Sequence, residues 1–288
     1  MTLRKRIVVC LDVQDGRLSG TVALPYLRDP GDPAEVAARY EQEGADEIAF
    51  LDRSASPQGK RQSLEAVRLS AERLTIPLTV GGGITGISDI GLTLRAGADK
   101  VSISSALVSI PDLLSEAAGR FGSEALVAGI TARAERRQVE MLTRPEGAPI
   151  VVTGAASKTD WFRVFTDGGR TATQLDAVAW AKQCVERGAG EILLTTIAQN
   201  ALLAGFDLEM TARVVEAVVV PVVANGGAGR AEHIRDVFLL AGADGAGAGE
   251  ILHAGAVTVA QLKRLLHDAG IPVRNPEPRP ELNEQQLP

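Results

Sequence analysis

The sequence predicts a single (β/α)8 barrel, a TIM barrel built from two repeated half-barrels, and two observations predict it. Eight short apolar runs alternate with helix-like segments along most of the 288-residue chain. Blocks of the first half also recur in the second half at a nearly constant distance. Because α/β barrels of about 200–250 residues form one domain, we expect one barrel over 1–274 rather than two domains. The tail, 275–288, is Pro-rich and polar and is expected to be disordered.

The eight apolar runs are the expected barrel strands. The first seven are rich in β-branched residues and are typical of buried parallel strands. The eighth is rich in glycine and fits a strand poorly by propensity. In chain order the runs are 7–13, 47–52, 78–83, 100–104, 125–131, 191–197, 220–227 and 245–252.

Helical patterns lie between these runs. Asp32 followed by Pro33 is a favoured pair at the start of a helix. Gly44 and Gly188 suit helix C-termini. The clearest helical segments are 32–44, 63–74 and 173–188.

The two halves repeat at an offset of 144 or 145 residues. Glu47 corresponds to Glu191, and Gly82 corresponds to Gly226. The first strands of the two halves match less well. Their motifs, CLD ending at Asp12 and GIT ending at Thr131, are separated by fewer residues than the other matching pairs. The second half therefore carries roughly 25 extra residues within 135–170, which we expect to form a hairpin-like excursion. Its aromatic residues either pack over the mouth of the barrel or, as we favour, onto the barrel's own helices; they are Trp161, Phe162 and Phe165.

Composition excludes several classes of function. Thirty basic and thirty-six acidic residues give a net charge of −6, and aromatic residues make up only 3%. Both values argue against binding of nucleic acid. Two cysteines and three histidines form no metal-binding pattern, so neither a metal nor another cofactor is expected. No signal peptide or apolar span of about 18 residues is present, which predicts a cytoplasmic protein without membrane contact.

Reactions in such barrels occur at the carboxyl ends of the strands. Two glycine clusters lie there at repeat-related positions, around Gly82 and around Gly226. Exposed backbone N–H groups in such turns bind phosphate, and two clusters predict a substrate with a phosphate at each end. The alternative is that these glycines only form tight turns.

Asp12 ends the first strand and is the candidate general acid or base. The alternative is an aspartate that only stabilises its loop. Asp52 ends the second strand in the same way, or pairs with Arg53 or Arg61. Cys10 is expected to be a buried core residue whose side chain points away from Asp12.

Charged residues also begin four of the expected strands. These residues face the bottom of the barrel, where two acids and two bases can neutralise each other as a ring. A structural layer that closes the barrel is the default interpretation. The four residues are Arg6, Glu47, Lys100 and Glu191, with Asp99 beside them.

Nine motifs occur in order: KRIVVCLDVQDGR, LRDPGDP, DEIAFLD, LTVGGGI, GADKVSI, RGAGEILLT, FDLEM, NGGAG and LAGAD. Together they resemble the cyclase subunit of imidazole glycerol phosphate synthase. The likeness covers nearly all of 4–273 except 135–170. It implies a duplicated half-barrel, a bisphosphorylated ribulose-type substrate at the mouth, and acid–base work by two strand-end aspartates. It also implies a glutaminase partner at the bottom and ammonia passing along the barrel axis.

At the mouth the resemblance is incomplete. Asp12 matches the first catalytic aspartate, but Thr131 stands where the family has the second. Ser19 replaces a loop lysine, and 198–202 replaces an Asp-x-Asp-Gly-Thr run. Glu250 follows Gly249 where a serine normally faces the second phosphate, and its carboxylate repels a dianion there.

The rest of the family pattern is present. The first phosphate cradle matches with Gly82, Gly83, Ser104 and Ser105, and the second matches in part with Asn225, Gly226, Gly227 and Gly249. The bottom set is complete, Asp99 included. In the family these residues form the gate for ammonia, although a purely structural layer explains them slightly better.

Three functions are therefore open. The sequence favours a lyase or ammonia-dependent cyclase of this family with altered chemistry or substrate. The alternatives are the ordinary cyclase subunit of histidine biosynthesis, and a catalytically silent partner of a glutaminase. Asp12 is the expected acid–base group, Thr131 and Asn200 are expected to orient the substrate by hydrogen bonds, and Glu250 is the candidate second carboxylate.

Overall fold

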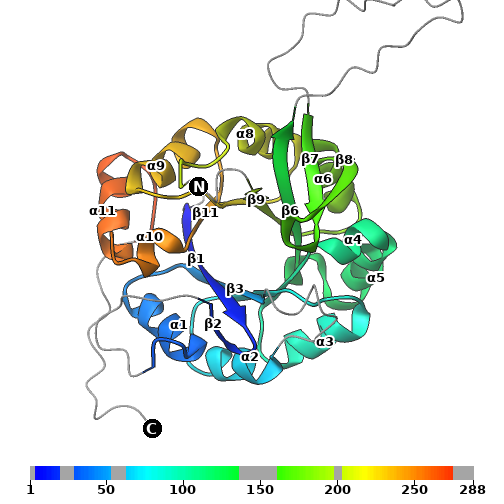
Figure 1. Ribbon diagram of the computed structural model, residues 1–288, viewed down its shortest axis with the longest axis horizontal. Helices are drawn as coiled ribbons and strands as arrows, with labels where there is room; N and C mark the ends of the chain where they lie inside the picture. Colours follow the sequence, from blue (N-terminus) through cyan, green and yellow to red (C-terminus); the bar gives the residue numbers. More distant parts are fainter. Residues whose placement is uncertain (1–3, 20–28, 53–62, 136–160, 198–202, 275–288) are drawn as a thin grey trace, which may run out of the picture.

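The computed structural model describes residues 4–19, 29–52, 63–135, 161–197 and 203–274. Eight parallel strands within these ranges close into a barrel, and helices surround it (Figure 1). The last strand pairs with the first, with Arg6 opposite Gly245. The predicted (β/α)8 barrel is therefore confirmed. Its strands, in order around the barrel, are β1 (Arg6–Gln14), β3 (Glu47–Asp52), β4 (Leu78–Gly81), β5 (Lys100–Ile103), β6 (Leu126–Glu135), β9 (Glu191–Thr196), β10 (Val222–Asn225) and β11 (Gly245–Ala248).

The helices begin and end largely where local chemistry predicts. The Asp32 side chain caps α1 by accepting from the Ala34 N–H at 2.9 Å. Gly44, just beyond this helix, has a φ of +101° that an L side chain rarely adopts. The helices are α1 (Pro33–Gln42), α2 (Leu64–Ala71), α3 (Ile87–Arg95), α4 (Ser105–Ser109), α5 (Asp112–Phe121), α6 (Ala177–Glu186), α8 (Leu208–Ala217), α9 (Ala231–Leu240), α10 (Glu250–His253) and α11 (Val259–Asp268), with 3₁₀ turns η1 (Ser123–Ala125) and η2 (Asp167–Gly169).

Three short strands add to the barrel sheet. The strand β2 (Arg17–Leu18) pairs with the end of β1. The antiparallel hairpin of β7 (Trp161–Thr166) and β8 (Thr171–Asp176) extends β6 at its carboxyl end. The hairpin is the described part of the expected excursion, and 136–160 and the tail lie outside the described residues.

Two predicted boundaries are wrong. The helix expected over 173–188 begins only at Ala177, because Thr173 bonds the Val164 carbonyl across the hairpin and Asp176 caps the helix start. The eighth strand ends at Ala248, and Glu250 opens α10 instead of continuing the run. In both places a strand and a helix follow each other with almost no linker.

Three apolar clusters form the core. One lies inside the barrel and includes Val8, Ala49 and Val127. The other two lie between strands and helices: one joins β1, β3, β4 and β11 to α1, α2, α9 and α11, and the other joins β5, β6 and β9 to the helices from α3 to α8. Interior side chains alternate with shell side chains along each strand, as the pleat requires.

Three barrel strands, β3, β5 and β11, are each preceded by an aspartate. Each aspartate forms hydrogen bonds to the start of the barrel strand before its own, an arrangement that we call a strand clamp. The Asp46 carboxylate accepts from the Ile7 N–H at 2.9 Å, and the Asp46 N–H donates to the Ile7 carbonyl at 3.0 Å. Each clamp therefore joins one strand to the next along the chain: β1 to β3, β4 to β5, and β10 to β11. The same two bonds form in the pairs Asp99–Leu78 and Asp244–Val222.

The strand pair β6 and β9 is joined at the corresponding position without a carboxylate. Gly190 stands in the place of the aspartates, and its N–H donates to the Leu126 carbonyl at 3.0 Å. The Leu126 N–H donates to the Ser123 carbonyl of η1. A Cβ on Gly190 would lie 2.2 Å from that same oxygen. The 3₁₀ turn therefore supplies the acceptor, and glycine is required to make room for it.

Candidate active site

A cavity of about 450 Å³ lies at the carboxyl ends of β1, β10 and β11. Asp12, Ser19 and Glu250 reach it from three separate segments, and His253 lies beside them. The two carboxylates make this side of the mouth acidic. The residues that line it are Cys10, Asp12, Ser19, Leu51, Leu203, Asn225, Gly226, Gly227, Ala228, Gly247, Gly249, Glu250 and His253.

Cys10 lies on the same side of β1 as Asp12, contrary to the sequence-based expectation. Residues two apart on a strand share a face, and Val8 and Cys10 both belong to the interior cluster. Cys10 is buried as predicted, and its Sγ lies 3.5 Å from Asn225 Oδ1. Burial, together with the negative charge of Asp12, raises the pKa of the thiol far above its ordinary value. The side chain is therefore a neutral wall of the cavity and not a nucleophile.

Thr131 lies away from this cavity, at the junction of three strands. It is opposite Thr195 on β9 and opposite Phe165 on β7. Asn225 Nδ2 donates to the Thr195 hydroxyl at 3.2 Å, which links β10 to the Thr131 side of the mouth. Asn200 lies outside the described residues.

The two glycine clusters share an unusual backbone. Gly82 and Gly83 have φ values of +99° and +65°, and Gly226 and Gly227 have values of +90° and +99°. A Cβ on Gly82 would also lie 2.1 Å from the Asp52 carbonyl oxygen. The repeat therefore extends to backbone conformation, and the turns themselves already require glycine.

The first cradle has a contact that the sequence did not reveal. Ser105 opens α4, and its hydroxyl accepts from the Asp167 N–H at 2.9 Å. The turn of the β7–β8 hairpin therefore reaches the helix start that was predicted to bind phosphate. The contact spans 62 residues, so no local pattern could have indicated it.

Two of the three aromatic residues of the hairpin, Trp161 and Phe162, lie against helices, as favoured from the sequence, whereas Phe165 lies opposite Thr131 of β6, with the Arg133 guanidinium 4.8 Å from its ring centre. Phe162 is buried in the shell cluster, and the Arg213 guanidinium lies 5.5 Å from its ring centre. Trp161 and Phe162 border a separate cavity of about 550 Å³ with Lys182 of α6.

His253 is a further mouth residue that the sequence analysis missed. Its Nε2 lies 3.0 Å from the Cys10 carbonyl oxygen, and its Nδ1 lies 2.7 Å from the Tyr40 hydroxyl. Burial lowers the pKa of the imidazole, and this outweighs the opposite effects of the Cys10 carbonyl, Glu250 and Asp12. A single histidine in an apolar segment gave no signal that could have found it.

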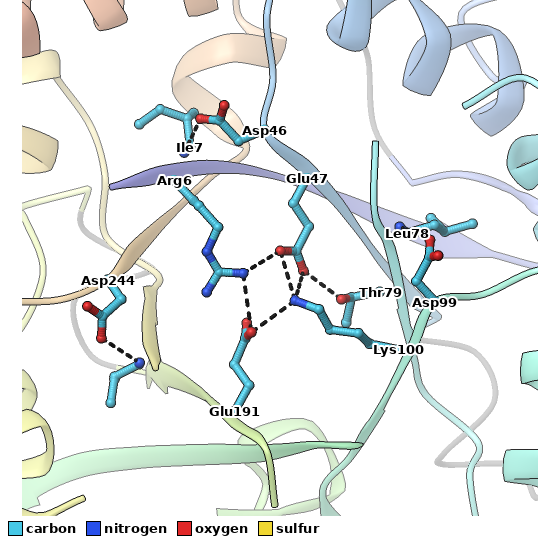
Figure 2. Close-up of polar contacts among 11 residues, drawn as sticks. Arg6, Ile7, Asp46, Glu47, Leu78, Thr79, Asp99, Lys100, Glu191 and Asp244 are labelled. Carbon is cyan, nitrogen blue, oxygen red and sulfur yellow. Dashed lines mark hydrogen bonds and ion pairs between the residues drawn. The ribbon is translucent and has the colours of Figure 1, made fainter. Parts of the chain in front are cut away.

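The opposite end of the barrel holds the predicted ring of charges (Figure 2). Arg6 Nη1 donates to Glu47 at 2.6 Å and to Glu191 at 3.2 Å. Lys100 Nζ also bonds both acids, at 3.0 Å and 2.9 Å. The Thr79 hydroxyl completes the set with a bond of 2.6 Å to Glu47. Each acid therefore bridges both bases.

The ring is electrostatically satisfied. Burial alone would lower the pKa of the Arg6 guanidinium, but Glu191 and Glu47 outweigh it, and the pKa lies above its ordinary value. Asp99 lies beside the ring, and its carboxylate accepts from the Leu78 N–H at 2.8 Å. It thus serves as a strand clamp beside the ring.

The described ranges contain neither a metal-binding cluster nor a membrane-spanning helix. No group of three or more His, Cys, Asp or Glu residues there is arranged to hold a metal ion. No helix there is long and apolar enough to cross a bilayer.

The fold and the mouth define a class: a (β/α)8 barrel with repeated glycine turns and a strand-end carboxylate where barrel enzymes carry out their chemistry. The model of the family "Histidine biosynthesis protein" matches residues 6–258. The chain belongs to this family, among the HisF-type subunits.

Curated relatives support this assignment along nearly the whole chain. The imidazole glycerol phosphate synthase subunit HisF of Myxococcus xanthus is 49% identical over 273 residues, which is 95% of this chain and 99% of the relative. The HisF subunit of Methanopyrus kandleri is 47% identical over 277 residues, with 95% and 99% covered. That of Anoxybacillus flavithermus is 45% identical over 272 residues, with 94% and 100% covered.

Proposed function

We propose that the chain is the cyclase subunit of an imidazole glycerol phosphate synthase, which uses ammonia to close an imidazole ring on a phosphorylated substrate. The observation that carries the proposal is the 45–49% identity to HisF subunits over almost their whole length. This identity weighs against the altered-chemistry interpretation that the sequence favoured.

In this proposal Asp12 exchanges protons with the substrate at the end of β1. It lines the cavity, and a positioned carboxylate in such a place typically contributes about 10²–10⁴-fold to a rate. Thr131, with no titrating group, orients the substrate through its hydroxyl on the far side of the mouth. Asn200, which lies outside the described residues, is given a similar orienting role from the sequence alone.

The two glycine turns bind the phosphates of the substrate. Gly82, Gly83 and Ser104 form the first site, with the start of α4 at Ser105. Asn225, Gly226, Gly227 and Gly249 form the second site on the wall of the cavity. Positive φ values turn successive backbone N–H groups into the concave arrangement that binds anions.

The bottom ring faces a glutaminase that supplies ammonia along the barrel axis. Support comes from the placement of the ring at the amino ends of β1, β3, β5 and β9, around the axis (Figure 2). A structural layer without a partner remains the competing explanation of the same contacts.

A second candidate is a related reaction on a substrate that lacks the second phosphate. Two observations favour it: Thr131 replaces a carboxylate, and Glu250 places a negative charge on the cavity wall beside Gly249. Like charges repel strongly where solvent is partly excluded, so a neutral or cationic group would suit this wall better than a phosphate.

A turnover assay with the ribulose-type bisphosphate and an ammonium salt tests both candidates. Formation of imidazole glycerol phosphate that is lost in Asp12→Asn supports the ordinary cyclase. If the unchanged chain forms no imidazole glycerol phosphate but the Thr131→Asp and Glu250→Ser variants do, the second candidate is supported. No turnover by any of these, together with stimulation of an added glutaminase, would overturn both in favour of a silent partner subunit.

A further inference from the structure

His253 joins three elements beside the mouth. It is the last residue of α10, and its ring bonds Tyr40 of α1 on one side and the Cys10 carbonyl of β1 on the other. The Tyr40 side chain is fully buried, and its ring centre lies 5.6 Å from that of His253. Tyr40 therefore anchors the junction inside the protein, while His253 is partly exposed and lines the mouth cavity.

The two contacts fix the state of the imidazole. A carbonyl oxygen can only accept, so Nε2 carries the proton and donates it to Cys10. In the neutral ring Nδ1 is then the acceptor for the Tyr40 hydroxyl. The ring thus donates one hydrogen bond to β1 and accepts one from α1.

A neighbouring glycine lies close to the hydrogen bond between His253 and Cys10. A Cβ on Gly249 would lie 3.3 Å from the Cys10 carbonyl oxygen and 3.6 Å from His253 Nε2. The chain therefore passes close to the hydrogen bond just before Glu250. The bond connects the backbone two residues before Asp12 to the single turn that begins with Glu250.

We propose that His253 is a positioning residue of the mouth. Through its Nε2 bond to Cys10 it holds two segments in one fixed arrangement: the β1 backbone just before Asp12 and the α10 turn that begins at Glu250. The inference rests on the proposed function only in placing the reaction at this mouth. The titratable groups that lie near His253 are Asp12, Glu250 and Tyr40. His253 touches no reacting atom in this assignment and acts through the backbone.

Two isosteric variants separate the contacts of the ring. His253→Gln keeps an amide N–H near Nε2 and loses the acceptor for Tyr40, whereas His253→Asn keeps an oxygen near Nδ1 and loses the donor to Cys10. Each removes one hydrogen bond, so both should destabilise the protein to a similar extent. Tyr40→Phe is the matched control for the α1 contact.

We expect kcat in the ammonium-dependent assay to stay within about 3-fold of the unchanged protein in His253→Gln and Tyr40→Phe, and to fall about 10–100-fold in His253→Asn, because small displacements at a site are costly. KM should change little in all three. A fall in kcat that follows stability equally in both histidine variants would overturn the proposal and leave a structural role.

Readouts that need no turnover keep the inference separate from the proposed function. ¹⁵N NMR of the imidazole should show a neutral ring protonated at Nε2. Hydrogen exchange of residues 11–13 and 249–252 should accelerate in His253→Asn and not in His253→Gln. A ring protonated at Nδ1, or equal exchange in the two variants, refutes the proposal even if the chain proves to be an active cyclase.

Discussion

The two ends of the barrel differ in the polar groups that they present. At the bottom, Arg6, Lys100, Glu47 and Glu191 bond one another, and both acids are buried. At the mouth, the cavity is lined by Asp12, Glu250 and glycine backbone. The bottom is thus complete without a ligand, whereas the mouth presents groups suited to one.

This difference bears on the two positions, Thr131 and Glu250, at which the resemblance implies a departure from the family pattern. Changing one member of the ring leaves buried charges without partners, which costs several kcal/mol. Thr131 and Glu250 lie at the mouth, where a changed side chain alters what binds and leaves the barrel intact. We therefore expect mutations at the bottom to act on stability and mutations at the mouth to act on turnover.

The largest effect is expected from Glu47→Ala. Both bases and Thr79 lose an acceptor, and the free energy of unfolding should fall by about 3–5 kcal/mol. Urea denaturation followed by circular dichroism measures it. The control is Glu65→Ala, which removes a solvent-exposed pair with Arg68 and should leave stability nearly unchanged. Equal effects of the two would remove the contrast between bottom and surface.

Asp12→Asn should show the opposite behaviour. We expect turnover to fall at least about 10²-fold, equivalent to about 2.7 kcal/mol, because the amide cannot exchange a proton. The unfolding midpoint should stay close to that of the unchanged chain. If Asp12→Asn lowered stability and turnover together, the mouth would contribute to folding stability as the bottom does.

The glycine turn of the first cradle should have an intermediate effect. Gly82→Ala forces a Cβ toward the Asp52 carbonyl at a φ of +99° and should destabilise by about 1–3 kcal/mol. Gly119→Ala, in the exposed part of α5 with open space around it, should instead stabilise by about 0.5–1 kcal/mol. Thermal melts of both variants check the difference in sign.

The smallest effect concerns pH. Because burial lowers the pKa of His253 in the folded protein, the unfolded chain takes up that proton first as the pH falls. This contribution to stability is complete above about pH 6.5 and is lost as the pH falls through the folded value. The difference in unfolding free energy between about pH 8 and about pH 5.5 should therefore shrink in His253→Gln. An unchanged difference would exclude the titration of this residue.

The fold was accessible from the sequence because the strands carry continuous apolar runs and the halves repeat. The errors occurred where long-range contacts decide the structure. Thr173 forms strand and not helix because Val164 lies across the hairpin. Ala248 ends β11 although the glycine-rich run continues beyond it.

The candidate site was accessible only in part. Asp12 and the glycine turns follow from the position of strand ends, and they were placed correctly at the mouth. The sequence-based prediction that Cys10 points away from Asp12 is wrong, because residues two apart on a strand share a face. The Ser105–Asp167 and His253–Tyr40 contacts join residues 62 and 213 apart, which no local pattern encodes.

The strand clamps have a consequence for how the chain can be rearranged. Asp46, Asp99 and Asp244 each join neighbouring strands within one strand–helix–strand segment, and the Ser123 turn does the same for the fourth. Lys5 and Val273 already pair, so the two ends can be linked. A circular permutant opened between β3 and β4 would preserve every clamp as a short-range contact. One opened between β4 and β5 would turn the Asp99 clamp into a long loop closure, and should refold more slowly.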